Sequence, residues 1–337
     1  MGPLSERVLA AIRGKPVDRP PVTFWRHFYD RETTAEGLAS AMVSFQLKYD
    51  WDLLKVNPRA CYHVQDWGAR FRFSGNPHVK PEMVESPIKG GKDLASLRKL
   101  SPTEGVLGDH LRAIRMIFNQ VGQETFVVMT LFTPLSIAGD LVGSVESLKR
   151  YMNESPEAVH EALSVITETF SSFAPLCLKA GASGIFYATT HWATRTNLTE
   201  KEYEVFGKPY DLKLLAAFQD APLNILHVCK SENMLGILSD YPVAAFSWTA
   251  TDPANPTLAE GKELTGKCVM GGIDHETTLQ ENSREDLSSE LERSVRETSG
   301  SHWIAAPGCA VSSHTPEENL RHVRGAITGF SSGRAIS

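Results

Sequence analysis

Residues 223–228 read LNILHV and residues 243–248 read VAAFSW, and these two runs decide the fold class. Both are of strand length, and neither alternates strictly between apolar and polar residues, which is typical of strands covered on both faces. A third run, KCVMGGI (267–273), follows, and longer amphipathic segments separate the three. This order of elements predicts parallel strands joined by helices.

The same alternation extends over nearly the whole chain. Five more strand-length runs are PPVTF (20–24), DLLKV (52–56), FVVMTLF (126–132), SGIFYA (183–188) and HWIAAP (302–307). Helix starts between the runs are marked by capping residues or proline at Thr33-Thr34, Ser155-Pro156, Ser283 and Thr315-Pro316. Eight strands alternating with helices predict a single-domain α/β protein, a (β/α)8 TIM barrel over residues 19–332, with an N-terminal helical extension at residues 1–18.

A doubly wound sheet is the structural alternative to the barrel. It is disfavoured because no glycine-rich dinucleotide turn follows the first predicted strand. Residues 62–75 alternate between apolar and polar side chains, so they are predicted to add a hairpin after the second strand.

The composition is that of an ordinary soluble globular protein, with 337 residues, 42% hydrophobic residues and a net charge of −6. The negative charge argues against nucleic acid or an anionic membrane as the main partner. No apolar run approaches the roughly 18 residues of a membrane helix, and the N-terminus lacks the apolar segment of a signal peptide. The five cysteines are odd in number and scattered, so we expect a cytoplasmic protein without a disulfide framework.

The chemistry-bearing motif lies at the end of the fifth run, where His227 and Cys229 stand two positions apart. Cys309 follows the eighth run, after Gly308, which permits a close approach of the chain. Loops at the carboxyl ends of barrel strands converge, so these side chains are candidates for a zinc site with three protein ligands and an open fourth position. The alternative is a buried histidine and two inert cysteines.

Two segments near the ends of the chain, RVLAAIRGKPVDRPPVTFWR (7–26) and PGCAVSSHTPEENLRHV (307–323), resemble the opening and closing segments of a known family. That family is the uroporphyrinogen decarboxylase superfamily, whose fold is a (β/α)8 barrel, and the resemblance extends over the whole chain. Residues 271–279, GGIDHETTL, match a family turn, except that His275 stands where proline is usual.

A few residues separate the branches of this superfamily. Decarboxylases carry Gly-His-Gly near the tail, where this chain has Cys309, and an essential aspartate after the second strand, where it has Asn57. Of two arginines after the first strand, only Arg26 is kept. His227, Cys229 and Cys309 match the zinc signature of the other branch, the corrinoid-linked methyltransferases such as the methylcobamide:coenzyme M enzymes.

The resemblance implies a zinc-dependent methyltransferase or demethylase that moves a methyl group between a corrinoid, or a small methylated substrate, and a zinc-activated thiolate. Its cofactors would be Zn²⁺ and an external corrinoid (cobalamin), on its own or on a carrier protein, because the chain has no Asp-x-His-x-x-Gly corrinoid motif. Two alternatives stay open: a uroporphyrinogen decarboxylase-type carboxy-lyase that acts without metal, and a non-catalytic barrel that binds a corrinoid or tetrapyrrole.

Four residues after predicted strands are candidates for the substrate pocket. Arg26 could clamp a carboxylate or sulfonate, or form a salt bridge to a loop acid. His191 and Trp192 follow the fourth run and could line the pocket or merely cap a loop. The resemblance implies that Asn57 contacts the substrate, because it stands where the decarboxylases have their essential aspartate. Arg26 and His191, together with Asp274, are the candidates for a catalytic role.

The remaining candidates are acids and histidines with a plain structural alternative. Asp274 could orient the ring of His227 as a carboxylate that does not itself bind the metal, or it could cap the next helix. Asp140 could face the pocket, although an exposed helix acid is the simpler reading. His275 and His314 could supply a fourth ligand or a proton shuttle. Three further cysteines have no partner pattern and are expected in the core: Cys61, Cys177 and Cys268.

Overall fold

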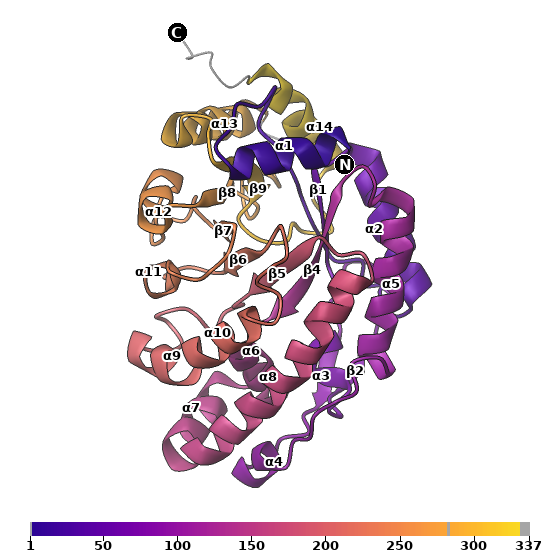
Figure 1. The fold of residues 1–337 in the computed structure, drawn as a ribbon, viewed down its shortest axis with the longest axis vertical. Helices are drawn as coiled ribbons and strands as arrows, with labels where there is room; N and C mark the ends of the chain where they lie inside the picture. The colour runs from indigo at the N-terminus through magenta and orange to yellow at the C-terminus, as the bar shows by residue number, and fades with distance from the viewer. Residues whose placement is uncertain (1, 282–283, 331–337) are drawn as a thin grey trace.

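The computed structural model describes residues 2–281 and 284–330, and its centre is a ring of parallel strands with the helices outside (Figure 1). Neighbouring strands pair in the order β1-β4-β5-β6-β7-β8-β9. The strands are β1 (Leu53–Val56), β4 (Phe126–Phe132), β5 (Gly184–Ala188), β6 (Ile225–Val228), β7 (Ala245–Trp248), β8 (Cys268–Ile273) and β9 (Trp303–Pro307). Seven of the eight predicted runs are therefore strands, and the fold is a TIM-barrel-like α/β structure in a single domain.

The helices lie where the amphipathic segments predict them, and capping explains their starts. The hydroxyl of Thr34 accepts the N–H of Gly37 at the start of α2, and Pro156 occupies the first turn of α8 after Ser155. The predicted start at Ser283 lies outside the described residues. The helices are α1 (Pro3–Ile12), α2 (Ala35–Tyr49), α3 (Tyr62–Gln65), α4 (Gly91–Ala95), α5 (Gly105–Val121), α6 (Pro134–Val142), α7 (Val145–Glu154), α8 (Pro156–Lys179), α9 (Glu200–Phe206), α10 (Lys208–Leu215), α11 (Leu235–Leu238), α12 (Leu258–Thr265), α13 (Arg284–Thr298), α14 (Glu317–Ala326) and the short 3₁₀ helix Ile327–Gly329.

The first predicted strand, residues 20–24, closes the ring between β9 and β1 through a single bridge. Val22 pairs with Ala305 of β9, and its carbonyl accepts the N–H of Asp52, just before β1, at 2.9 Å. Pro20 and Pro21 have no N–H to donate to a ladder, and the N–H of Val22 is taken by the Asp52 carboxylate at 2.8 Å. This segment is therefore too poor in backbone donors to form a regular strand.

Asp52 also ties the N-terminal helix to the ring. Its fully buried carboxylate receives two hydrogen bonds from Arg19, at 2.6 and 3.0 Å. A third, at 2.6 Å, comes from Arg7 of α1. Val8 of the same helix packs into the apolar cluster inside the barrel. Helix α1 thus covers one end of the barrel interior.

The ring separates two apolar regions because side chains alternate between its faces. In β6, Ile225 points into the barrel and Leu226 toward the helices. His227 and Cys229 share the inward face of Ile225 because they follow it at even spacing. The inner cluster contains Leu53, Phe126, Val128, Phe186, Ala188, Leu223, Ala245, Cys268, Met270, Ile304 and Ala306. Polar side chains on the inward face therefore come together where this cluster ends.

The hairpin predicted within residues 62–75 is wrong in its position. Residues 62–65 form helix α3, and the antiparallel pair is made by β2 (Arg70–Arg72) and β3 (Glu82–Glu85). Part of the alternation in 62–75 thus belongs to a short helix whose residues Tyr62, His63 and Val64 are all buried.

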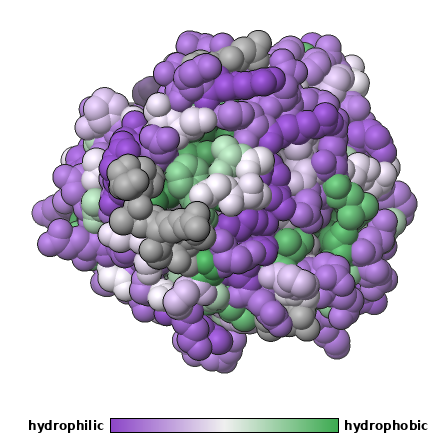
Figure 2. All heavy atoms as spheres, turned by 90° about the horizontal axis from the view of Figure 1, so that it is seen from above, coloured by the Kyte–Doolittle hydropathy of each residue, from purple (hydrophilic) through white to green (hydrophobic). Residues whose placement is uncertain are grey.

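The surface that carries α1 and α14 in Figure 1 is mainly hydrophilic, with smaller hydrophobic areas (Figure 2). In the described part of the chain, no helix is both long and apolar enough to span a membrane.

Candidate metal centre and its cavity

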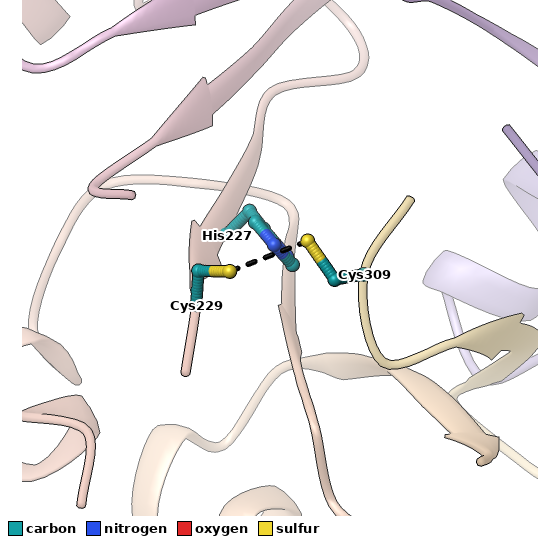
Figure 3. Close-up of side chains that lie close together, drawn as sticks. All are labelled: His227, Cys229 and Cys309. Atoms are coloured by element: carbon teal, nitrogen blue, oxygen red, sulfur yellow. Dashed lines mark hydrogen bonds between the residues drawn. The ribbon is translucent and has the colours of Figure 1, made fainter. Parts of the chain in front are cut away.

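His227, Cys229 and Cys309 lie together at the carboxyl ends of β6 and β9. One potential ligand atom from each residue lies within 4.8 Å of the other two. The two sulfur atoms are 3.3 Å apart, and the imidazole ring lies beside the line that joins them (Figure 3). Gly308 makes this approach feasible, because a Cβ there would lie 2.8 Å from side-chain atoms of Thr249.

The orientation of His227 leaves one ring nitrogen for a ligand. Nδ1 lies 3.1 Å from the hydroxyl of Ser247 on the neighbouring strand β7. Nε2 is buried and has no hydrogen-bond partner. A buried polar nitrogen without a partner costs free energy unless another group, such as a metal ion, binds to it. The free imidazole nitrogen and two close thiols are the soft, mixed donor set that zinc accepts. The residues present therefore fit a zinc ion.

The two thiols differ in how readily they ionise. The pKa of Cys309 is held well below its ordinary value, first because the Cys229 thiol donates a hydrogen bond to its sulfur and then because His227 is close. The pKa of Cys229 is raised well above its ordinary value by that hydrogen bond and by burial. The pair thus holds one proton in preference to two or none, and a positive ion would displace that proton.

A cavity of about 270 Å³ opens beside the two sulfur atoms. Its walls include Trp25, His27, Lys55, Asn57, His63, Thr130, Phe132, Asp140, Phe186, His191, His227, Cys229 and Cys309. Asn57 and His191, two candidates for the substrate pocket, thus line the same cavity as the candidate metal ligands. A second cavity of about 400 Å³ adjoins the two cysteines on the side of Asp274 and His275.

Lys55 is one of the residues of this cavity that sequence reasoning missed. Its side chain is buried at 7% exposure on the inward face of β1, and its ammonium donates to the amide oxygen of Asn57. Burial lowers the pKa of Lys55 to about 7, against the attraction of Cys309 and Cys229. The available signal was a lysine among the apolar residues of LLKV (53–56).

Asp140 lies on the cavity wall and is paired, in contrast to the simpler reading of an exposed helix acid. Its carboxylate is 2.8 Å from Nε2 of His63 and 3.4 Å from the indole nitrogen of Trp192. Burial alone would raise the pKa of Asp140, but the hydrogen bond with His63 holds it below its ordinary value. Trp192 is buried and lines an adjoining cavity with His191 and Asp140, beyond the wall of the thiol cavity.

Arg26 does not line the cavity of the candidate metal ligands. Its guanidinium lies over the rings of Phe28 and Phe45, 4.8 and 5.5 Å from their centroids. It faces a separate cavity of about 300 Å³. Trp25 takes the inward position in this extended segment, so the next side chain along the chain points outward. The clamp predicted for Arg26 would therefore act in a neighbouring groove.

Asp274 caps the turn that follows β8, and neither of its two predicted roles, orienting His227 or capping the next helix, describes it. Its carboxylate accepts the N–H groups of Glu276 and Thr277 and the hydroxyl of Thr277, while His227 is held by Ser247 instead. His275 lies beside Cys309 in the adjoining cavity, and its Nδ1 is buried without a partner.

The other predicted histidine and the remaining cysteines lie away from the candidate ligands. The ring of His314 stacks on His78, with centroids 4.0 Å apart. Cys61, Cys177 and Cys268 are buried, as expected of core residues.

Comparison with known proteins places these features in a family. The sequence pattern described as "Uroporphyrinogen decarboxylase (URO-D)" matches residues 3–330. Methylcobamide:CoM methyltransferase MtaA of Methanosarcina barkeri is 24% identical over 94% of this chain and 95% of its own. The chloroplastic uroporphyrinogen decarboxylase 2 of Arabidopsis thaliana is 23% identical over 94% of this chain and 84% of its own.

Among solved structures, a methyltransferase from Methanosarcina mazei superposes with a TM-score of 0.86 at 22% identity, covering 98% of this chain and 99% of its own. A B12-independent methionine synthase from Shewanella is more distant, with a TM-score of 0.56 at 11% identity over 92% of this chain and 94% of its own. The predicted resemblance is confirmed: the chain belongs to the uroporphyrinogen decarboxylase family.

Proposed function

We propose that this protein is a zinc-dependent methyltransferase or demethylase that moves a methyl group between a corrinoid, or a small methylated compound, and a thiolate activated at the metal. The observation that carries the proposal is the convergence of His227, Cys229 and Cys309, with a buried imidazole nitrogen that lacks a partner. The likeness to corrinoid methyltransferases over nearly the whole chain supports the same reaction class.

The three side chains would hold the ion, and each is prepared for that role by its surroundings. The proton of His227 is kept at Nδ1 if that atom donates to Ser247, which leaves the Nε2 lone pair free. Cys229 and Cys309 would supply two thiolates, whose charges together with a neutral imidazole balance a divalent cation. Zinc bound there would lower the pKa of a substrate thiol and keep the thiolate nucleophilic.

The cavity would exclude water from the transferred methyl group. The rings of Trp25, Phe132 and Phe186 contribute to its walls beside the thiols, and an apolar surface strengthens charge interactions within it. A volume of about 270 Å³ is at the small end of ligand cavities, which suits a small methylated compound or thiol. The corrinoid would come from outside, on its own or on a carrier protein.

The test compares two cysteine-to-alanine variants of the full-length protein. Purified wild-type protein should contain about one zinc ion per chain, measured by atomic absorption, and should transfer methyl groups between methylcobalamin and 2-mercaptoethanol, followed by the corrinoid spectrum. Cys229→Ala should lose both the metal and the transfer. Cys268→Ala is the control, because Cys268 is equally buried but lies in the inner apolar cluster.

Two results would contradict this function. Full transfer activity in Cys229→Ala would show that the thiols do not take part. A metal-free wild-type protein that releases CO₂ from uroporphyrinogen would instead support the decarboxylase activity that the plant relative's name describes.

A further inference from the structure

The side chains of Trp192, Asp140 and His63 form a chain of hydrogen bonds that ends at the wall of the cavity beside the two thiols. The indole N–H of Trp192 donates to one carboxylate oxygen of Asp140 at 3.4 Å, and the other oxygen lies 2.8 Å from Nε2 of His63. Burial alone would raise the pKa of Asp140, but the hydrogen bond with His63 keeps it below the ordinary value, so the carboxylate is ionised at neutral pH. An ionised carboxylate only accepts hydrogen bonds, so Nε2 of His63 carries a hydrogen and donates it.

The opposite ring nitrogen of His63, Nδ1, is buried and has no hydrogen-bond partner. His63 is 4% exposed, and its ring packs against Phe132, with the centroids 4.4 Å apart. Because Nε2 carries the hydrogen of the neutral imidazole, Nδ1 keeps its lone pair and can accept a proton. His63, Phe132 and Asp140 all line the cavity of the two thiols. The wall of this cavity therefore holds an oriented imidazole whose accepting atom lacks a donor.

Apart from the candidate ligand His227, two other histidines line the same cavity, and neither is oriented in this way. In the described part of the chain, no hydrogen bond holds the ring of His191, and burial lowers its pKa. Nδ1 of His27 lies 3.5 Å from a carboxylate oxygen of Glu32, but neither atom forms a hydrogen bond. His63 is thus better oriented than either of them to accept a proton.

Three further titratable groups around His63 are poor proton acceptors. Lys55 has no lone pair as an ammonium, in which form it donates to an amide oxygen. Lys80, in the same cavity wall, is an exposed cation. His110 interacts electrostatically with His63, but burial lowers its pKa to about 4, so it stays neutral near pH 7. Among these groups, His63 is the one that combines a carboxylate partner with a free lone pair.

We propose that His63, oriented by Asp140, is the general base that takes the proton of the substrate thiol before its sulfur is methylated. The inference rests on the proposed function and deepens it by naming the residue that handles this proton. In this step the S–H bond breaks, its electron pair stays on the sulfur, and the hydrogen forms a new bond with Nδ1 of His63. The imidazolium keeps its Nε2–H on Asp140, so the positive charge in the cavity wall is paired with a carboxylate.

The methylation of a thiol always leaves one proton over, since a neutral thiol becomes a neutral thioether and the donor keeps the electron pair of its bond to the methyl group. The rings of Trp25, Phe132 and Phe186 line the cavity and would restrict the access of water to the sulfur. An isolated charge is costly in such surroundings. An acceptor in the wall therefore lowers the free energy needed to form the thiolate.

The test counts protons without any methyl transfer. 2-Mercaptoethanol is titrated calorimetrically into the zinc-loaded, full-length protein at about pH 7.5, where a free thiol is still mainly protonated. Buffers of different ionisation enthalpy then give the number of protons released to the solvent. The wild type should release fewer than about 0.3 protons per thiol bound, because His63 retains the proton that the thiol loses at the metal. His63→Gln cannot take up this proton and should release about one.

A second variant covers the case in which His63→Gln misfolds. Asp140→Asn keeps the size of the side chain but removes the anion that stabilises the imidazolium, so its proton release should lie between the other two values. If only Asp140→Asn binds the thiol, release equal to that of the wild type would contradict the proposal. His160→Gln is the control, because His160 of α8 bonds to Tyr210 and does not line the cavity; it should release as few protons as the wild type.

The possible failures of this inference and of the proposed function can be told apart. Equal proton release by the wild type and His63→Gln, with zinc and thiol bound, would overturn the role of His63 and leave the proposed function standing. Proton release that rises in His191→Gln but not in His63→Gln would assign the base to the other histidine. A wild-type protein that binds neither zinc nor the thiol would refute the proposed function, and the role of His63 would fall with it.

Discussion

The hydroxyl of Ser247 decides which nitrogen of His227 faces the two sulfur atoms. Imidazole carries two nitrogens of similar basicity, and the partner of one sets the role of the other. Ser247 lies on β7 next to His227 on β6, and register pairs the two residues directly. The inward face of the ring of strands therefore supplies both the candidate ligand and the group that orients it.

Removing that hydroxyl should weaken metal binding without emptying the site. In Ser247→Ala, Nδ1 of His227 loses its partner at 3.1 Å, so the ring can turn and the metal affinity should fall about 10- to 100-fold. Competition with a chromophoric chelator measures the affinity. Ser289→Ala, an exposed serine on α13, is the control. An affinity equal to that of the wild type would mean that Ser247 does not position the ring.

At this scale the sequence indicates the metal ligands better than it indicates the rest of the cavity. His227, Cys229 and Cys309 combine rare residue types with strand ends, so their convergence follows from the barrel. The sequence does not identify Lys55, because a lysine in an apolar run suggests an exposed position. Only the alternation of side chains along β1 shows that Lys55 points into the barrel. Arg26 follows an extended segment without a regular ladder, so the sequence does not reveal which way it points.

At the scale of elements, the carboxylate of Asp52 joins α1, the closing segment and β1. It is fully buried and contacts two guanidinium groups, those of Arg7 and Arg19. Removing one partner from a buried ion pair leaves the other charges uncompensated. The carboxylate of Asp52 thus reinforces the backbone contacts that close the ring between β9 and β1.

Asp52→Asn should destabilise the protein by about 3–5 kcal/mol, because the buried Arg19 loses its counter-ion and Arg7 keeps only its pair with Asp18. Urea denaturation followed by circular dichroism measures the free energy of unfolding. Asp50→Asn is a matched control two positions away, since the Asp50 side chain is 64% exposed in its pair with Arg324 and should lose no more than about 1 kcal/mol. Similar losses in the two variants would contradict the role of Asp52.

Strand-length apolar runs predict seven strands correctly because strands buried on both faces leave a strong signal. The eighth run differs through its prolines: residues 20–24 lie in the predicted place but lack the donors for a ladder. The hairpin is displaced because residues 62–65 form a helix, and the hydrophobic period of a segment of only four residues does not distinguish a helix from a strand.

For the molecule as a whole, a buried acid away from the cavity makes stability depend on pH. Asp211 of α10 accepts hydrogen bonds of 2.8 Å from Tyr203 and from Tyr241. Burial raises its pKa from 3.8 to about 7, against the effect of these hydroxyl groups. The folded protein therefore binds this proton more tightly than the unfolded chain does.

The contribution of Asp211 to stability is complete below about pH 4 and is lost as the pH rises toward 7. A shift of this size corresponds to at most roughly 4 kcal/mol. Denaturation at pH 5 and pH 8 should show a smaller difference in unfolding free energy for Asp211→Asn than for the wild type. Asp220→Asn, an exposed acid nearby in sequence, should leave the difference unchanged. A wild-type pH dependence retained in Asp211→Asn would refute this assignment.

The bridge between Val22 and Ala305 has a consequence for how the molecule is made. A ribosome releases residues 20–24 before all the strands of the ring and β9 after the others, so the closing segment has no partner on that side while the strands between them are synthesised. In the same way, the thiol of Cys229 has no partner until Cys309, which follows it by 80 positions, has been synthesised. The ring and the pair of thiols are thus completed together, by the last strand to emerge, and a nascent chain that stops before Trp303 possesses neither.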